Sequence, residues 1–161
     1  MKASVYSETT IPSFIVARMS PVLVTAGRQL ITRQWWDEQR ENYRLYISSV
    51  VEAEIVEGDT AFAEQRLALV AEVPRLYITD EVTVLADEFF RRLRLPDKAR
   101  NDAVHLALAC YFEVDYLLTW NLTHLANGHV QRVLAHLYRT REMAIPIICT
   151  PEQLMQWRSV P

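Results

Sequence analysis

Short apolar runs alternate with longer amphipathic segments along most of the chain. The short runs are rich in β-branched and aromatic residues, which favour strands; they lie at 3–8, 45–48, 76–78, 116–120 and 145–149. The longer segments have apolar residues at helical spacing; they cover about 20–40, 50–58, 60–73, 80–93 and the residues after Pro96, with a further helix after the first strand. Strands that are apolar on both faces and alternate with helices predict a three-layer α/β/α sandwich with a mostly parallel central sheet.

The length of the chain, 161 residues, is enough for one domain with a substantial core and too short for two. We therefore expect a single domain over residues 1–161. Cys110 and Cys149 both lie inside apolar runs, which is typical of buried free thiols in a reducing compartment. No segment has the pattern of a signal peptide or of a membrane span, so we expect a cytoplasmic protein with no membrane contact.

The formal net charge of −3 gives the chain no general attraction for nucleic acid. A polyanionic partner would have to be held by local basic patches or by metal ions. Two groups of arginines are candidates for such patches, with ordinary solvated helix faces as the favoured alternative: Arg91, Arg92 and Arg94, and Arg132, Arg139 and Arg141.

Acidic residues near the ends of the predicted strands are the first candidates for chemistry. In an open parallel sheet, side chains that bind ligands gather at the carboxyl ends of the strands. Glu8 directly follows the first strand, in YSETTIP, and is placed to face this edge. A helix cap or a solvated side chain is the alternative interpretation of Glu8.

The segment ISSVVEAEIVEG contains two carboxylates with different expected roles. If Ser49 begins the helix as its N-cap, Glu52 stands at the third helical position and completes a capping box. Glu54 instead falls close to Ile55, on the arc of the helix that should face the sheet. Burial of an unpaired charge costs several kcal/mol, so a metal or a hydrogen-bonded cluster is favoured over a simple salt bridge as the partner of Glu54.

The helix after Pro96 contains two polar residues on one face. Asp97 is a good N-cap residue, which would leave Asp102 more than one turn inside the helix and without a capping role. His105 lies three residues further on and shares that face among apolar neighbours. We interpret His105 as a support for an acidic cluster or as a core histidine, rather than as a catalytic base.

Two more polar residues flank the strand YLLTW. Asp115 precedes the strand and should lie at the edge away from the site, in a turn or capping role, whereas Asn121 follows it and should lie at the carboxyl edge. Glu8, Glu54, Asp102 and Asn121 would then converge from four distant segments. Converging carboxylates repel one another, and a divalent cation with oxygen ligands, Mg²⁺ or Mn²⁺, is the usual resolution.

Three segments together resemble the PIN domain family, and in particular the PIN proteins related to VapC-type toxins: VYSETTIPS, ISSVVEAEI and the block NDAVHLALA with DYLLTWNLTHLAN. PIN domains are metal-dependent nucleases that act mostly on RNA. The resemblance implies metal ligands at Glu8, Glu54 and Asp102, with Asn121 as the fourth catalytic position. It also implies supporting roles for Thr119 and His105. Glu8 is one methylene longer than the usual aspartate and Asn121 is neutral where many relatives have an acid, which implies weaker metal binding.

The resemblance further implies Mg²⁺ (or Mn²⁺) as cofactor, RNA as substrate, a cognate antitoxin protein and a homodimer. Adjacent Trp35 and Trp36 on one helix cannot both face the same core, so one of them is a candidate for a dimer or antitoxin interface, with partial exposure as an equal alternative. Two other functions stay open from the imperfect acidic set: a scaffold that binds RNA or protein without cleavage, and a nuclease of DNA or structured nucleic acid.

Overall fold

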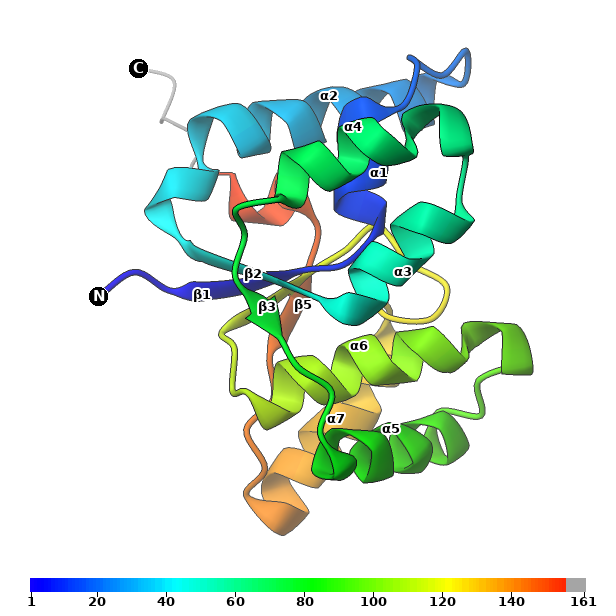
Figure 1. Cartoon of the computed structure of the whole chain (residues 1–161). Coiled ribbons are helices and arrows are strands. Elements are labelled where there is room, and N and C mark those ends of the chain that lie inside the picture. Colours follow the sequence, from blue (N-terminus) through cyan, green and yellow to red (C-terminus); the bar gives the residue numbers. More distant parts are fainter. Residues whose placement is uncertain (156–161) are drawn as a thin grey trace.

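Five short strands form a parallel sheet at the centre of the fold (Figure 1), in the order β3-β2-β1-β4-β5. The computed structural model describes residues 1–155. The strands are β1 Ser4–Ser7, β2 Arg44–Ser48, β3 Arg75–Leu76, β4 Tyr116–Leu118 and β5 Ile147–Cys149. Every pairing between neighbouring strands is parallel, and each strand lies inside or at the edge of a predicted segment. The predicted α/β class with a parallel sheet is therefore confirmed.

Helices cover both faces of this sheet, with α1, α2 and α4 on one side and α5, α6 and α7 on the other (Figure 1). The α-helices are α1 Thr10–Val16, α2 Leu23–Glu38, α3 Ser49–Glu57, α4 Thr60–Val70, α5 Asp80–Arg92, α6 Arg100–Tyr111 and α7 Gly128–Arg141. Three short 3₁₀ helices complete the described elements: η1 Arg40–Asn42, η2 Asp97–Ala99 and η3 Pro151–Leu154. None of the helices within residues 1–155 is long and apolar enough to cross a bilayer.

The start of α3 differs from the predicted capping box. Ser48, the last residue of β2, is the N-cap, and its hydroxyl accepts a hydrogen bond from the Val51 N–H at 3.5 Å. The helix begins one residue early because the buried strand runs directly into it. Glu52 instead pairs with Arg75 at the start of β3, with 2.7 Å between nitrogen and oxygen. The predicted box between Ser49 and Glu52 is therefore wrong, although Glu52 still has a structural partner.

The start of α6 also differs from the expectation. Asp97 opens a 3₁₀ turn without a side-chain capping bond, and the α-helix begins only at Arg100. Asp102 consequently stands in the first turn of α6 rather than deeper inside the helix. At that position the positive end of the helix dipole favours its carboxylate.

The tryptophan pair on α2 is buried within the monomer, so the expectation that one of them faces an interface is wrong. Trp35 is completely buried and Trp36 is 3% exposed. Trp35 packs against Tyr43 after η1, and the Arg40 guanidinium lies over the Trp36 ring at 4.9 Å. Both faces of the helix end are covered because the chain turns back over it through η1. The two cysteines are buried free thiols, as predicted.

Asp115 binds the opposite edge of the sheet, as its position before β4 predicted. Its Oδ2 accepts hydrogen bonds from the Ser4 N–H and hydroxyl at 2.7 and 2.8 Å, and the Asp115 N–H donates to the Ser4 hydroxyl at 2.9 Å. These bonds from Ser4 lower the pKa of Asp115. The residue therefore ties the amino ends of β1 and β4 together and lies apart from the carboxyl edge.

Asp115→Ala should reduce the free energy of unfolding by about 1 kcal/mol, the usual net contribution of a hydrogen bond. Binding of Mn²⁺ should stay at the wild-type level, because the substitution is at the opposite edge from the candidate site. Urea denaturation and calorimetric titration would measure the two quantities. A large loss of Mn²⁺ affinity in a folded variant would contradict the placement of Asp115 outside the site.

Candidate metal centre

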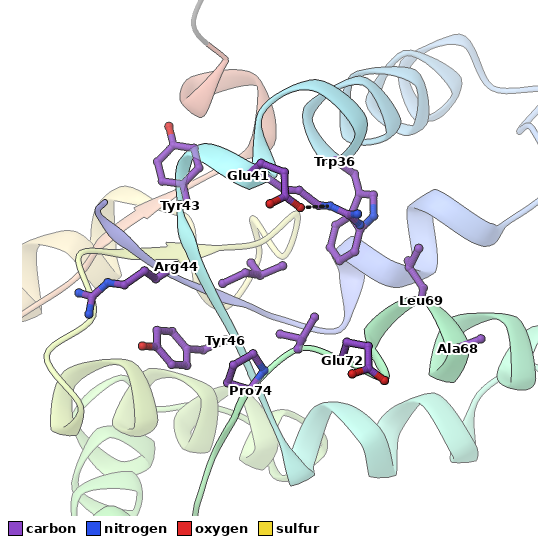
Figure 2. A pocket seen from close by; sticks show the side chains of 12 residues that line it. Trp36, Glu41, Tyr43, Arg44, Tyr46, Ala68, Leu69, Glu72 and Pro74 are labelled. Carbon is purple, nitrogen blue, oxygen red and sulfur yellow. Dashed lines mark hydrogen bonds and ion pairs between the residues drawn. The ribbon is translucent and has the colours of Figure 1, made fainter. Parts of the chain in front are cut away.

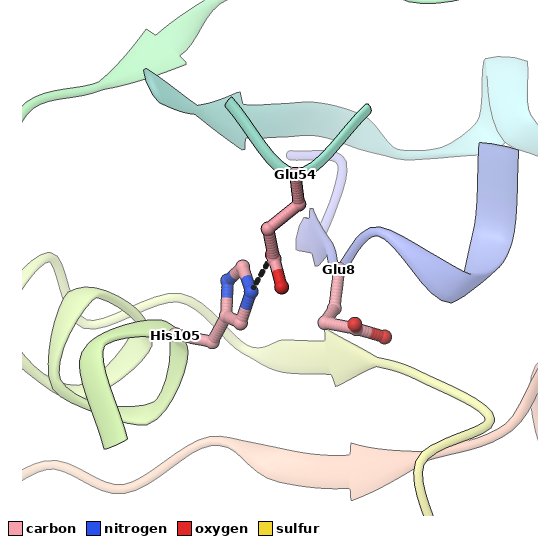
Figure 3. A group of neighbouring side chains, drawn as sticks. All are labelled: Glu8, Glu54 and His105. Atoms are coloured by element: carbon pink, nitrogen blue, oxygen red, sulfur yellow. Dashed lines mark hydrogen bonds and ion pairs between the residues drawn. The ribbon is translucent and has the colours of Figure 1, made fainter. Parts of the chain in front are cut away.

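Glu8, Glu54 and His105 come together at the carboxyl edge of the sheet (Figure 3), and one ligand atom from each lies within 4.8 Å of the others. Glu8 follows β1, Glu54 projects from α3 and His105 from α6. The three side chains thus meet from segments separated by about forty residues or more in the sequence. Glu8 and Glu54 were both predicted to lie here as ligands, and His105 was predicted as a support.

Glu8 is held by hydroxyl groups on both sides. The side chain is 4% exposed, and its Oε2 accepts hydrogen bonds from the Thr10 hydroxyl at 2.6 Å, the Thr10 N–H at 3.1 Å and the Thr119 hydroxyl at 2.7 Å. No residue within 1–155 donates to the other oxygen, Oε1. Burial raises the pKa of Glu8 and outweighs the opposing effects of His105 and of the hydroxyls. One oxygen is therefore fixed while the other keeps its capacity to bind a cation.

Thr10 also connects Glu8 to the segment after β4. Its hydroxyl accepts a hydrogen bond from the Trp120 N–H at 2.8 Å while donating to Glu8. Thr119 makes the same connection from the other side, since its hydroxyl donates to Glu8 and its N–H donates to the carbonyl of Cys149. The ends of β1, β4 and β5 are thus joined through the Glu8 carboxylate.

Glu54 and His105 are joined by a hydrogen bond of 2.6 Å between Oε1 and Nε2. Glu54 also accepts a hydrogen bond from the Thr9 hydroxyl at 2.7 Å. Burial favours the neutral form of Glu54, but His105 and Thr9 outweigh it and lower its pKa. Burial likewise favours neutral His105, but the bond to Glu54 and the charges of Glu8 and Asp102 outweigh it and raise its pKa.

The other ring nitrogen of His105 is held from inside the core. Its Nδ1 lies 2.7 Å from the Tyr6 hydroxyl, which lies 2.7 Å from the hydroxyl of Ser48. All three side chains are buried. This chain of hydrogen bonds fixes the orientation of the imidazole, so His105 is a buried core histidine. Its role as a support for the acids stays a prediction.

Asp102 and Asn121 lie together beside this group. The Asp102 carboxylate is 2.9 Å from Nδ1 of His124. Burial raises the pKa of Asp102 and outweighs the charge of His105 and the hydrogen bonds from Asn121 and His124. Asn121 uses its side-chain oxygen to accept a hydrogen bond from the His124 N–H at 3.0 Å. Asp102 is therefore coupled electrostatically to His105. It does not belong to the group of Glu8, Glu54 and His105, whose ligand atoms lie within 4.8 Å of one another.

Three residues at this edge were not singled out from the sequence: Thr9, Thr10 and His124. Thr9 and Thr10 directly follow Glu8, and two hydroxyls beside a buried carboxylate are a readable signal for its hydrogen-bond donors. His124 follows Asn121 by three residues, which is the spacing at which an N-cap side chain accepts from a backbone N–H. Its pairing with Asp102 has no comparable signal, because the two residues belong to different segments.

The donor set fits a divalent cation. Carboxylate oxygens of Glu8 and Glu54 lie within 4.8 Å of each other and of His105, and Asp102 adds a third acid nearby. Burial raises the pKa of both Glu8 and Asp102, which is the expected result where acids lack sufficient neutralising charge. Mg²⁺ and Mn²⁺ both accept carboxylate ligands.

A concavity also lies elsewhere on the molecule and is not part of this centre. A pocket of about 550 Å³ opens over the amino end of β2 (Figure 2). Its lining includes Trp36, Tyr43, Arg44 and Pro74. The candidate site is therefore identified by the acidic residues at the carboxyl ends of the strands and not by this pocket.

Comparison with known proteins supports the fold. The structure is similar to a chain in the crystal structure of VapBC2 from Rickettsia felis bound to a DNA fragment from their promoter, with a TM-score of 0.54 and 13% sequence identity. The match covers 91% of this chain and 98% of that chain. At this identity the similarity shows a common fold, which agrees with the parallel α/β fold that the resemblance implies. No family model matches the sequence, and no curated protein matches it as a relative.

Proposed function

We propose that the protein is a metal-dependent endoribonuclease of the PIN type. The observation that carries the proposal is the placement of Glu8 and Glu54, with free carboxylate capacity, at the carboxyl edge of a PIN-like sheet. Glu8, Glu54 and Asp102 would hold Mg²⁺ or Mn²⁺, with His105 beside them and Asn121 acting directly or through a water molecule. When bound, the cation supplies Lewis-acid stabilisation of the phosphodiester and lowers the pKa of the attacking water.

The residues of this chain perform the positioning. Thr10 and Thr119 direct Glu8 by fixing one of its oxygens, while Thr9 and His105 direct Glu54. Hydrolysis needs an in-line water and a stabilised leaving oxygen but no covalent intermediate. A cysteine nucleophile is disfavoured, because Cys110 and Cys149 are buried and burial raises the pKa of both thiols to about 12.

We further propose a protein antitoxin as partner, with the chain acting as the toxin of a toxin–antitoxin pair in the cytoplasm as a homodimer. The similarity to a chain of a VapBC2 complex supports the toxin–antitoxin context. A non-cleaving scaffold that binds RNA or protein is the second candidate. It is favoured by Asn121, because its side-chain oxygen is already engaged in the turn to His124.

The test is cleavage of an RNA panel by the full chain, with Mg²⁺, Mn²⁺ or EDTA. Glu54→Gln and Asp102→Asn should each lower the rate of cleavage at least about 100-fold. Loss of a residue that only supports a metal ligand costs up to about 100-fold, and loss of a ligand itself should cost no less. Glu57→Gln is the matched control, because Glu57 is an exposed carboxylate at the end of the same helix.

Thermal melting should show that all three variants remain folded. Absence of cleavage by the wild-type protein with either metal, combined with retained RNA binding, would favour the scaffold. Cleavage of DNA or structured nucleic acid, added to the same panel, would identify a nuclease with one of those substrates instead of single-stranded RNA. Equal activity of Glu54→Gln and wild type would refute the assignment of the site.

A further inference from the structure

A second concavity, of about 410 Å³, lies where α1 ends and α4 begins. It is lined by Ala17, Arg18, Asp59, Ala61, Phe62 and Arg66. The turn from α3 to α4 and the segment after α1 lie on the same side of the molecule as the carboxyl ends of the strands (Figure 1). Helix α1, seven residues and about 10 Å long, connects the segment after β1 that contains Glu8 to this concavity. We call it the Arg18–Arg66 site.

Arg66 is a buried cation without an acidic partner among the described residues. It is 8% exposed, and its Nε has no hydrogen-bond partner within residues 1–155. One terminal nitrogen, Nη1, donates to the carbonyl of Asp59 at 3.3 Å. The same nitrogen lies close to Gly58 at the end of α3, where the negative end of the helix dipole offers partial compensation. The Nε–H keeps its capacity to donate to an anion.

Arg18 brings a second cation to the same concavity. Its guanidinium lies over the Phe62 ring at 5.9 Å. Its backbone is fixed, because the buried side chain of Gln29 donates to the Arg18 carbonyl and accepts from the Ser20 N–H, both at 2.9 Å. The Asp59 carboxylate, the acid in the lining, is engaged with the Ala61 N–H at 3.0 Å. Two arginines thus line one concavity that contains a single carboxylate, and one oxygen of that carboxylate is bound to the start of α4.

We propose that the Arg18–Arg66 site binds a backbone phosphate of the nucleic acid strand that passes the acidic centre, a proposal that rests on the proposed function. Guanidinium groups match phosphate oxygens with paired N–H donors. A chain of net charge −3 needs such local cations to hold a polyanion next to its own acids. The site recognises phosphate rather than base, so it adds affinity without sequence preference.

Binding of a fluorescein-labelled RNA oligonucleotide would test the site by anisotropy, in EDTA and across 50–200 mM salt. Arg18→Gln should weaken binding about tenfold at the lower salt and reduce the slope of log K against log salt by about one. Arg44→Gln is the matched control, because Arg44 is an exposed arginine at the amino end of β2, and it should leave binding unchanged. Equal weakening by the two variants, or an unchanged slope, would overturn the proposal.

The role of Arg66 is tested with a conservative variant, because removal of a buried side chain could prevent folding. Arg66→Lys keeps the charge but lacks the Nε–H donor, so it should also weaken RNA binding in a protein with a wild-type circular dichroism spectrum. In NMR spectra of arginine Nε–H groups, inorganic phosphate should shift the Arg66 signal in the wild type and leave it in place in Arg18→Gln. No shift at saturating phosphate would contradict the site. These experiments measure binding of RNA and phosphate, not cleavage. Failure of the Arg18–Arg66 site can therefore be distinguished from failure of the nuclease proposal.

Discussion

Replacement of Glu8 by glutamine should abolish metal-dependent cleavage and, at the same time, raise the melting temperature of the metal-free protein. Cleavage should fall at least about 100-fold, because the variant loses the charged oxygen of a proposed ligand. Stability should rise because the wild-type protein buries a carboxylate whose pKa burial raises. The amide of glutamine fits the same space, and its oxygen accepts the hydrogen bonds of Thr10 and Thr119 without a buried charge.

The pH dependence of this gain follows from the raised pKa. The folded protein binds the Glu8 proton more tightly than the unfolded chain does, so ionisation of Glu8 lowers stability as pH rises above the ordinary carboxyl pKa. Melting in EDTA at pH 4 and pH 8 should therefore show a larger advantage for the variant at pH 8. Glu57→Gln serves as control and should show neither effect. A lower melting temperature for Glu8→Gln than for the wild type at pH 8 would contradict the account.

Substitution of His105 by glutamine should lower the free energy of unfolding by about 2 to 3 kcal/mol near pH 6. His105 is completely buried and binds both Tyr6 and Glu54. A hydrogen bond to a charged group contributes about 1.5 to 3 kcal/mol and a neutral one about 1 kcal/mol, and glutamine retains only part of this. Urea denaturation in EDTA would measure the difference.

The destabilisation should shrink as pH rises. Because the pKa of His105 is raised in the folded state, its stabilising charge is fully present below the unfolded pKa of about 6.5. That contribution is lost as pH rises through the folded value. The wild type and variant should therefore differ less in stability at alkaline pH, whereas substitution of the exposed His136 on α7 by glutamine should change stability little at any pH. A difference that stays constant with pH would mean that His105 stabilises the fold only by packing and neutral hydrogen bonds.

The positions of the strands along the chain and the parallel sheet could be predicted from the sequence. So could the edge of the sheet at which Glu8 and Asn121 lie. Alternation of apolar strands with helices determines the class of fold, and the rule for carboxyl ends places Glu8 and Asn121 on one edge and Asp115 on the other. These are consequences of local pattern and chain direction, which need no knowledge of side-chain contacts.

Details that depend on contacts between segments were not predictable in the same way. The Asp102–His124 pair joins α6 to the segment after β4, and no sequence pattern links these two segments. The burial of Trp36 depends on Arg40, whose guanidinium lies over the Trp36 ring. The capping residue of α3 was misassigned by one position because Ser48 and Ser49 are chemically identical. Only the burial of the strand end, where Ser48 also binds Tyr6, distinguishes them.

The hydroxyl of Thr10, which joins Glu8 to the backbone at Trp120, has a consequence for ligand binding. A side chain held by three donors from two crossover segments has few rotamers left. The conformational entropy of ordering it is lost once, during folding, and is not lost again on each encounter with a ligand. Preorganisation of this kind lets an acid with a longer and more flexible side chain than aspartate present its oxygen as rigidly as the shorter residue would.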